Sequence, residues 1–120
     1  MKARAVAKYI KGSPQKARLV IDLIRGRKAN EALAILSASH KRAAKPIEIT
    51  LRSAIANAEQ KADQLNVTVD VDRLVISTAM VDLGPTKYRR RVRPAPMGRA
   101  YRERRWNSHI TIEVETGKEE

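Results

Sequence analysis

The chain has 120 residues, and its 25 Lys and Arg against 13 Asp and Glu give a formal net charge of +12. This length supports one domain, and a hydrophobic share of 42% suffices for one core. The lack of cysteine excludes disulfides and thiolate sites, and no apolar run approaches the roughly 18 residues of a membrane span.

The N-terminal part of the chain predicts a short strand followed by a helix. Residues 2–10 alternate loosely, as in a strand with a wet, basic face, and one side would carry Ala3, Ala5, Ala7 and Tyr9. Ser13 suits the cap of a helix through its hydroxyl, Pro14 suits its first position, and Gly26 suits its end. The buried side of this helix would consist of Ala17, Val20, Ile21 and Ile24, widened by Leu23.

Two further helices are predicted in the middle of the chain. The first covers residues 29–39, and its inner side comprises Ala32, Leu33, Ile35 and Leu36. The second is the longest, over about 41–65, and its apolar stripe comprises Ile47, Leu51, Ala54, Ile55 and Ala58. Pro46 either marks the true start of this helix or kinks its first turns, and we favour a start near Lys41 with a kink.

The second half of the chain predicts two strands joined by a long hairpin. Residues 66–73 form a connection with some strand character, where Asp70 and Asp72 indicate a solvated strand face or turn rather than a cation site. Residues 74–83 form a strand with one face made of Leu74, Ile76, Thr78 and Met80. A second extended stretch, 99–114, ends in a period-two pattern at Ile110, Ile112 and Val114.

The segment between these strands must project from the body once 74–83 and 110–114 pair at its base. Its arginine-rich composition forbids burial in the core, and a two-stranded ribbon is unstable alone in water, so something outside the protein must hold it. We expect an α+β fold: a small three-helix body packed on a short antiparallel sheet, with a long protruding basic β-hairpin. The single domain, 1–120, would comprise a globular body of 1–83 plus 108–116, an extended hairpin of 84–107 and a short acidic tail of 117–120.

The basic residues form two blocks around a neutral middle. Residues 1–28 and 84–109 each carry a net charge of +8, whereas 29–83 carry −1 and 110–120 carry −3. One basic run is as often a solvated face as a binding surface, and a surface charged only for solubility mixes both signs. Two blocks within structure-forming sequence favour a polyanionic partner, in particular a nucleic acid.

The sequence offers no arrangement that indicates catalysis. His40 and His109 are the only histidines, and no nucleophile motif or glycine-rich phosphate loop accompanies them. We therefore expect a non-enzymatic protein without a metal site or cofactor.

The most informative segment for binding is 87–94, because the planar fork of arginine binds phosphate bidentately and stacks on bases. Tyr88, Tyr101 and Trp106 lie among these charges and suit stacking on unpaired RNA bases, although the two tyrosines equally suit plain strands. For His109, contact with RNA and a simple strand position are both open. The candidate RNA-binding residues are Lys2, Arg4, Lys8, Lys11, Ser13, Lys16, Arg18, Arg25, Arg27, Lys28, Lys87, Arg89, Arg90, Arg91, Arg93, Arg99, Arg102, Arg104, Arg105, Trp106 and His109.

Several short motifs occur in one order along nearly the whole chain: 13–20, 24–27, 53–59, 81–86, 98–100 and 108–111. Together they resemble the bacterial-type family of the large-subunit ribosomal protein numbered twenty-two. The resemblance implies a body on the outside of the large subunit and a hairpin that runs through ribosomal RNA to the nascent-peptide exit tunnel. The tunnel-lining tip would comprise Arg90, Arg91, Val92, Arg93, Pro94 and Ala95.

The same resemblance implies the partners and the location of the protein. Its partners would be large-subunit ribosomal RNA, neighbouring large-subunit ribosomal proteins and the nascent peptide near the tip. It would act early in ribosome assembly, be a monomer outside the ribosome, contact no membrane and work in the cytoplasm, with an organelle origin also open.

A DNA-architectural protein with basic β-arms is the alternative from another class. Such proteins dimerise through a helical body to place two arms symmetrically. The chain has no evidently surplus apolar helix face for such a dimer, which counts against this alternative.

Overall fold

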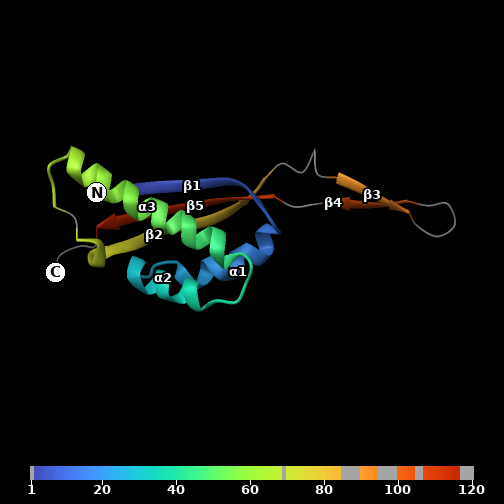
Figure 1. Ribbon diagram of the computed structural model, residues 1–120, viewed down its shortest axis with the longest axis horizontal. Coiled ribbons are helices and arrows are strands. Elements are labelled where there is room, and N and C mark those ends of the chain that lie inside the picture. The colour runs from blue at the N-terminus through green and yellow to red at the C-terminus, as the bar shows by residue number, and fades with distance from the viewer. Residues whose placement is uncertain (1, 69, 85–89, 95–99, 105–106, 117–120) are drawn as a thin grey trace.

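Three helices cover one face of a three-stranded antiparallel sheet, and a separate two-stranded ribbon follows (Figure 1). The computed structural model describes residues 2–68, 70–84, 90–94, 100–104 and 107–116. The predicted α+β class is confirmed. In chain order the elements are β1 (Lys2–Lys11), α1 (Pro14–Ile24), α2 (Ala29–Ala38), α3 (Ala44–Gln64), the 3-10 helix η1 (Val71–Arg73), β2 (Leu74–Leu83), β3 (Arg90–Pro94), β4 (Ala100–Arg104) and β5 (Asn107–Thr116).

The last strand of the chain, β5, occupies the centre of the larger sheet. The strand order is β1-β5-β2, and both pairings are antiparallel. Because β5 is paired on both sides and covered by helices, Ile110, Ile112 and Val114 are at most 1% exposed. The predicted pairing of 74–83 with 110–114 is confirmed.

A β-bulge in β2 reverses the face predicted for the second half of that strand. The register with β5 shifts between Ile76 and Thr78. Ile76 is buried, but beyond the bulge Ala79 and Val81 are buried instead, and Met80 is 42% exposed. The predicted grouping of Thr78 and Met80 with Ile76 is therefore wrong, because one extra residue moves every later side chain to the opposite face.

A second irregularity lies near the end of β1. Ala3 and Ala5 face the core as predicted, but the register with β5 shifts between Ala7 and Ile10. Tyr9, predicted on the same side as the alanines, is instead 63% exposed and has a φ of +59°. The placement predicted for Tyr9 is therefore wrong, since the bulge turns it away from the core.

Helix α1 follows its predicted pattern with two differences. Pro14 lies at its first position and Gly26 follows its end, and the predicted apolar side is buried except at Leu23, which is 48% exposed. Ser13 occupies the cap position, yet its side chain makes no capping hydrogen bond, so the hydroxyl cap predicted for Ser13 is wrong. The backbone carbonyl of Ser13 accepts from the Ala17 N–H instead.

Helices α2 and α3 bury the sides predicted for them, but α3 begins later than expected. The stripe from Ile47 to Ala58 is buried, and in α2 Ala32 and Leu36 are buried while Leu33 and Ile35 pack partly against the core. The start near Lys41 is wrong, because α3 begins at Ala44 and Pro46 lies in its first turn. A residue in the first turn has no intrahelical acceptor for its N–H, so proline is tolerated there.

The connection after α3 ends in η1 and not in a strand. The Asp70 carboxylate accepts from the Asp72 N–H at 3.0 Å, and the Asp72 carboxylate accepts from the Asn30 side-chain amide. The strand character predicted for 66–73 is therefore wrong for the described residues. The two carboxylates belong to a turn, the second of the two readings given above.

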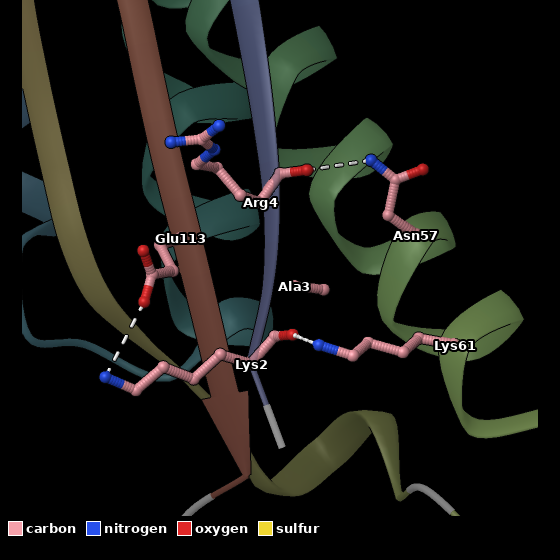
Figure 2. A pocket seen from close by; sticks show the side chains of 6 residues that line it. All are labelled: Lys2, Ala3, Arg4, Asn57, Lys61 and Glu113. Atoms are coloured by element: carbon pink, nitrogen blue, oxygen red, sulfur yellow. Dashed lines mark hydrogen bonds and ion pairs between the residues drawn. The ribbon is translucent and has the colours of Figure 1, made fainter. Parts of the chain in front are cut away.

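Side chains of α3 cover the outer edge of β1 (Figure 2). The Asn57 amide donates to the Arg4 carbonyl at 2.9 Å, and the Lys61 ammonium donates to the Lys2 carbonyl at 2.7 Å. These contacts satisfy backbone acceptors that would otherwise be open to pairing with another chain.

Strands β3 and β4 form the separate ribbon, which we call the arm. Arg90 pairs with Arg104 at one end, and Pro94 pairs with Ala100 at the other. The radius of gyration is 17.9 Å, against about 14 Å for a compact domain of this length. The elongated shape, 67 × 27 × 19 Å, agrees with a protruding hairpin (Figure 1). The predicted hairpin also includes 85–89, 95–99 and 105–106, which lie outside the described residues, as does the predicted tail 117–120.

Gly84 lies where the chain leaves β2, and it leaves no room for a side chain. Its N–H donates to the Asn107 carbonyl at 2.8 Å, and an added Cβ would lie 2.9 Å from Asn107 Cβ. Gly84→Ala should therefore lower the free energy of unfolding by about 1–3 kcal/mol, the usual penalty of overpacking. Urea denaturation measures this change. Gln15→Ala, on the exposed side of α1, is the control and should stay within about 0.5 kcal/mol of the wild type. Equal stability of the two variants would contradict the expected crowding.

Candidate nucleic-acid interface

The pairing of β1 with β5 joins the two basic blocks in space. Lys11 pairs with Asn107, so the end of β1 lies beside the strand that returns from the arm. Ser108 pairs with both Ile10 and Leu83, the last residue of β2. We call this end of the body, where Lys11, Leu83 and Asn107 meet, the arm end (Figure 1).

Three lysines of the first block gather at or beside the arm end. Lys8 and Lys11 lie in the last four residues of β1, and Lys16 lies in the first turn of α1, the next element of the chain. All three side chains are exposed, and none has an ion-pair or hydrogen-bond partner within the described part of the chain. Their positive charge is therefore available to an anionic partner without the loss of any contact in the body.

The loop between β1 and α1 is fixed to β5. The Ser108 hydroxyl donates to the Gly12 carbonyl at 3.0 Å, and Ser108 is 2% exposed. Ser13, the next residue, is half-buried, and its hydroxyl makes no capping hydrogen bond to α1. The bond from Ser108 attaches the backbone of the loop between Lys11 and Lys16 to β5.

Two arginines predicted to bind RNA also make hydrogen bonds within the body. Arg18 Nε donates to the Val81 carbonyl at 3.1 Å. Arg25 donates to the Ala79 carbonyl through Nε at 3.1 Å and through Nη2 at 2.8 Å. These bonds attach α1 to the outer edge of β2, so both guanidiniums have a structural role that the prediction did not include.

The remaining cations of the first block lie farther from the arm end. Arg27 Nε donates to the Leu23 carbonyl at 2.9 Å, and Lys28 forms a β-bridge with Val75 at the start of β2. Lys2, at the opposite end of β1, lies 3.7 Å from the Glu113 carboxylate and is partly neutralised by it. A predicted RNA surface that includes all of these residues is therefore spread over more than one side of the body.

Lys2, Arg4 and Lys61 line an open hollow between β1 and α3 (Figure 2). The amines of Lys2 and Lys61 are already engaged, the first by Glu113 and Glu115 and the second by the Lys2 carbonyl. The two amines of the hollow are thus engaged within the body, whereas the lysines of the arm end have no partner among the described residues.

His109 has a defined structural contact at the arm end. Its Nδ1 accepts from the Tyr9 N–H at 3.1 Å, and the two rings meet edge to face with centroids 5.1 Å apart. The structure therefore gives His109 a strand position with a bonded Nδ1, which was one of the two predicted possibilities. The Tyr9 contact could not be read from a sequence in which the two residues are 100 positions apart.

The structure describes the backbone of the arm strands and their register. Arg91 pairs with Glu103, Val92 with Arg102, and Arg93 with Tyr101. The other predicted hairpin residues, Lys87, Arg89, Ala95, Arg99, Arg105 and Trp106, lie outside the described residues.

Within the described ranges, no three His, Asp or Glu side chains gather closely enough to hold a metal ion. Among the helices that these ranges include, none is both long and apolar enough to cross a bilayer. The feature that the described residues do provide is a cluster of unpaired cations beside the base of a basic ribbon.

Comparisons with known proteins agree on one family. The chain matches the family described as Ribosomal protein L22p/L17e over residues 5–115. It is 53% identical over 114 residues to the large ribosomal subunit protein uL22 of Solibacter usitatus (strain Ellin6076), covering 95% of this chain and 96% of that protein. It is 52% identical over 119 residues to the protein of the same name from Halothermothrix orenii (strain H 168 / OCM 544 / DSM 9562), covering 99% of each.

The contacts of α1 predict different effects for two of its cations. Arg25→Ala should lower the free energy of unfolding by about 1 kcal/mol, because the bonds to the Ala79 carbonyl and the ion pair with Asp22 are lost at a partly exposed site. Lys16→Ala removes an exposed cation from the same helix and should change the free energy of unfolding by less than about 0.5 kcal/mol. Urea unfolding of both variants tests this difference, and a Lys16→Ala variant destabilised as much as Arg25→Ala would refute it.

Proposed function

The chain belongs to the Ribosomal protein L22p/L17e family and is a structural, non-enzymatic constituent of the bacterial-type large ribosomal subunit, and we propose that its arm end docks on large-subunit ribosomal RNA. The observation that supports this surface above others is the meeting of the two basic blocks where β1 pairs with β5. Ribosomal RNA and ribosomal proteins are its partners as a component of that subunit. The DNA-architectural alternative is set aside because the chain belongs to a ribosomal protein family.

We propose a division of labour within the single domain 1–120. The body, 1–83 plus 108–116, would anchor the protein, and the hairpin, 84–107, would extend along the RNA. The segment 84–109 carries a net charge of +8, and an isolated two-stranded ribbon needs an external support. Phosphates along an RNA channel supply both the support and the counter-charge, since arginine binds them bidentately.

We further propose that the hairpin tip, 90–95, reaches the wall of the nascent-peptide exit tunnel and contacts nascent peptides there. Support comes from the resemblance to the family and from an arm that lies beyond the body. In this proposal the protein is a monomer outside the ribosome, works in the cytoplasm, and enters the subunit early in assembly.

Among the predicted RNA-binding residues, the structure favours Lys8, Lys11 and Lys16 in the body. They are exposed and without partners in the described part of the chain, whereas Arg18 and Arg25 hold α1 to β2. A cation that loses no intramolecular contact on binding contributes its full phosphate interaction, and each such contact adds about 0.7–0.9 to the salt dependence of binding.

The division of labour predicts distinct effects for two triple variants. Lys8→Gln, Lys11→Gln and Lys16→Gln together should weaken binding to large-subunit RNA and reduce the slope of log K against log salt by about 2–3. Arg90→Gln, Arg91→Gln and Arg93→Gln together should leave entry into subunits nearly intact, because the body contacts remain. They should instead alter the tunnel wall, and with it the passage of nascent chains or the binding of tunnel drugs.

Incorporation and tunnel function are measured separately, by sedimentation with assembled large subunits and by drug binding to those subunits. The control is Glu59→Gln, at an exposed residue of α3 away from the arm end, and it should behave as the wild type in both measurements. A tip variant that fails to enter subunits, together with a body variant that enters normally, would show that the division is wrong.

A further inference from the structure

We propose that Tyr9 is a stacking platform for one unpaired base of the ribosomal RNA, with Lys8 and Lys11 placed for the phosphates on either side. This inference rests on the proposed docking of the arm end on RNA, and it assigns a base-binding role to a residue of the body rather than of the arm. Four properties of Tyr9 carry it: its backbone conformation, its contact with His109, its exposure and its charged neighbours.

The backbone of Tyr9 is held in a conformation that bulky residues avoid. Its φ is +59°, in the left-handed region that favours glycine. Lys8 and Tyr9 together oppose His109 alone in the β1–β5 ladder, between the pairs Ala7–Ile110 and Ile10–Ser108. Strained conformations of this kind persist only where the surroundings hold them, and they concentrate at functional sites.

His109 holds the bulge in place from the central strand. Its Nδ1 accepts the Tyr9 N–H at 3.1 Å, and the rings are nearly perpendicular, at 89°. Gly84 packs beside the same imidazole, since an added Cβ would lie 3.2 Å from His109 Cε1. The partly buried histidine thus lies between β1 and the residue that follows β2, and it acts here as a positioning residue for the tyrosine.

The bulge directs an aromatic side chain into solvent. Tyr9 is 63% exposed, although Ala3 and Ala5, on the alternating side of the same strand, are at most 8% exposed. An aromatic ring that served only the core would continue this alternation. A ring turned outward against a supporting histidine presents its surface to a partner instead.

The chemistry around the ring favours a base over an apolar protein surface. Lys8 and Lys11 are exposed and unpaired within the described residues, and the neighbouring strand returns from the basic arm. Every base has a face that can stack on an aromatic ring, and stacked bases are flanked by phosphates that lysines can contact. An apolar protein pocket would have to desolvate the same lysines without compensation.

The test uses the full chain and a transcript of a complete bacterial large-subunit RNA, with affinities measured by filter binding at several KCl concentrations. Tyr9→Gly should bind about 5- to 150-fold more weakly, the range that removal of one stacked base contact gives. Its salt dependence should equal that of the wild type, because no phosphate contact is removed. Tyr9→Phe retains the ring and should bind within about threefold of the wild type.

A loss of affinity in Tyr9→Gly should occur without a loss of folding. Glycine adopts the +59° φ freely, so the urea midpoint of this variant should be no lower than that of the wild type. Tyr9→Asn, which also tolerates this region, repeats the measurement should the glycine variant unfold more easily. Lys8→Gln is the electrostatic control and should lower the salt slope by about 0.7–0.9.

The outcomes separate this inference from the proposed function. Wild-type affinity in a folded Tyr9→Gly or Tyr9→Asn variant would overturn the stacking role, as would a Tyr9→Phe variant that binds as weakly as Tyr9→Gly. If the Lys8, Lys11 and Lys16 triple variant binds the RNA with the affinity and salt slope of the wild type, the docking of the arm end itself would be overturned. Weak binding of Tyr9→Gly with an unchanged salt slope, and normal binding of Tyr9→Phe, supports the inference.

Discussion

The double pairing of β5 is the constraint on which the architecture depends. This strand bonds to β1 on one side and to β2 on the other, and its inward residues are almost completely buried. The chain returns from the arm directly into β5, so the arm is joined to the most firmly held strand of the body. The arm needs such an anchor, because a two-stranded hairpin alone is marginal in water.

The central position of β5 leaves β1 and β2 as the two edges, and the helices cover both. Asn57 and Lys61 of α3 bond to the carbonyls of β1, and Arg18 and Arg25 bond to those of β2. Two sets of cations therefore differ in what their side chains do. One set closes the sheet edges against pairing with other chains, and the other set, the lysines of the arm end, makes no such bonds, as the proposed docking on RNA requires.

Several irregular features of the described backbone lie at the arm end. The bulge at Tyr9, the close approach of Gly84 to Asn107 and the bond from Ser108 to the Gly12 carbonyl all lie where the strands meet the arm. Regular pairing alone would leave this end as three plain strand termini. The irregularities instead fix a loop, a tyrosine and several lysines in one place, which suits a surface that receives a folded RNA.

The sequence by itself determined the fold class, the helices and the existence of a basic hairpin. Helical spacing shows which residues of α1 and α3 are buried, and an arginine-rich segment cannot enter a core, so both follow from local chemistry. Only the tertiary structure decided that β5 lies between β1 and β2, that Thr78 and Met80 change sides, and that Tyr9 turns outward. It also decided which arginines are structural, since Arg18 and Arg25 bond to carbonyls 63 and 54 positions away. Strand order, bulges and edge contacts depend on backbone groups that every residue possesses, and residue types therefore do not encode them locally.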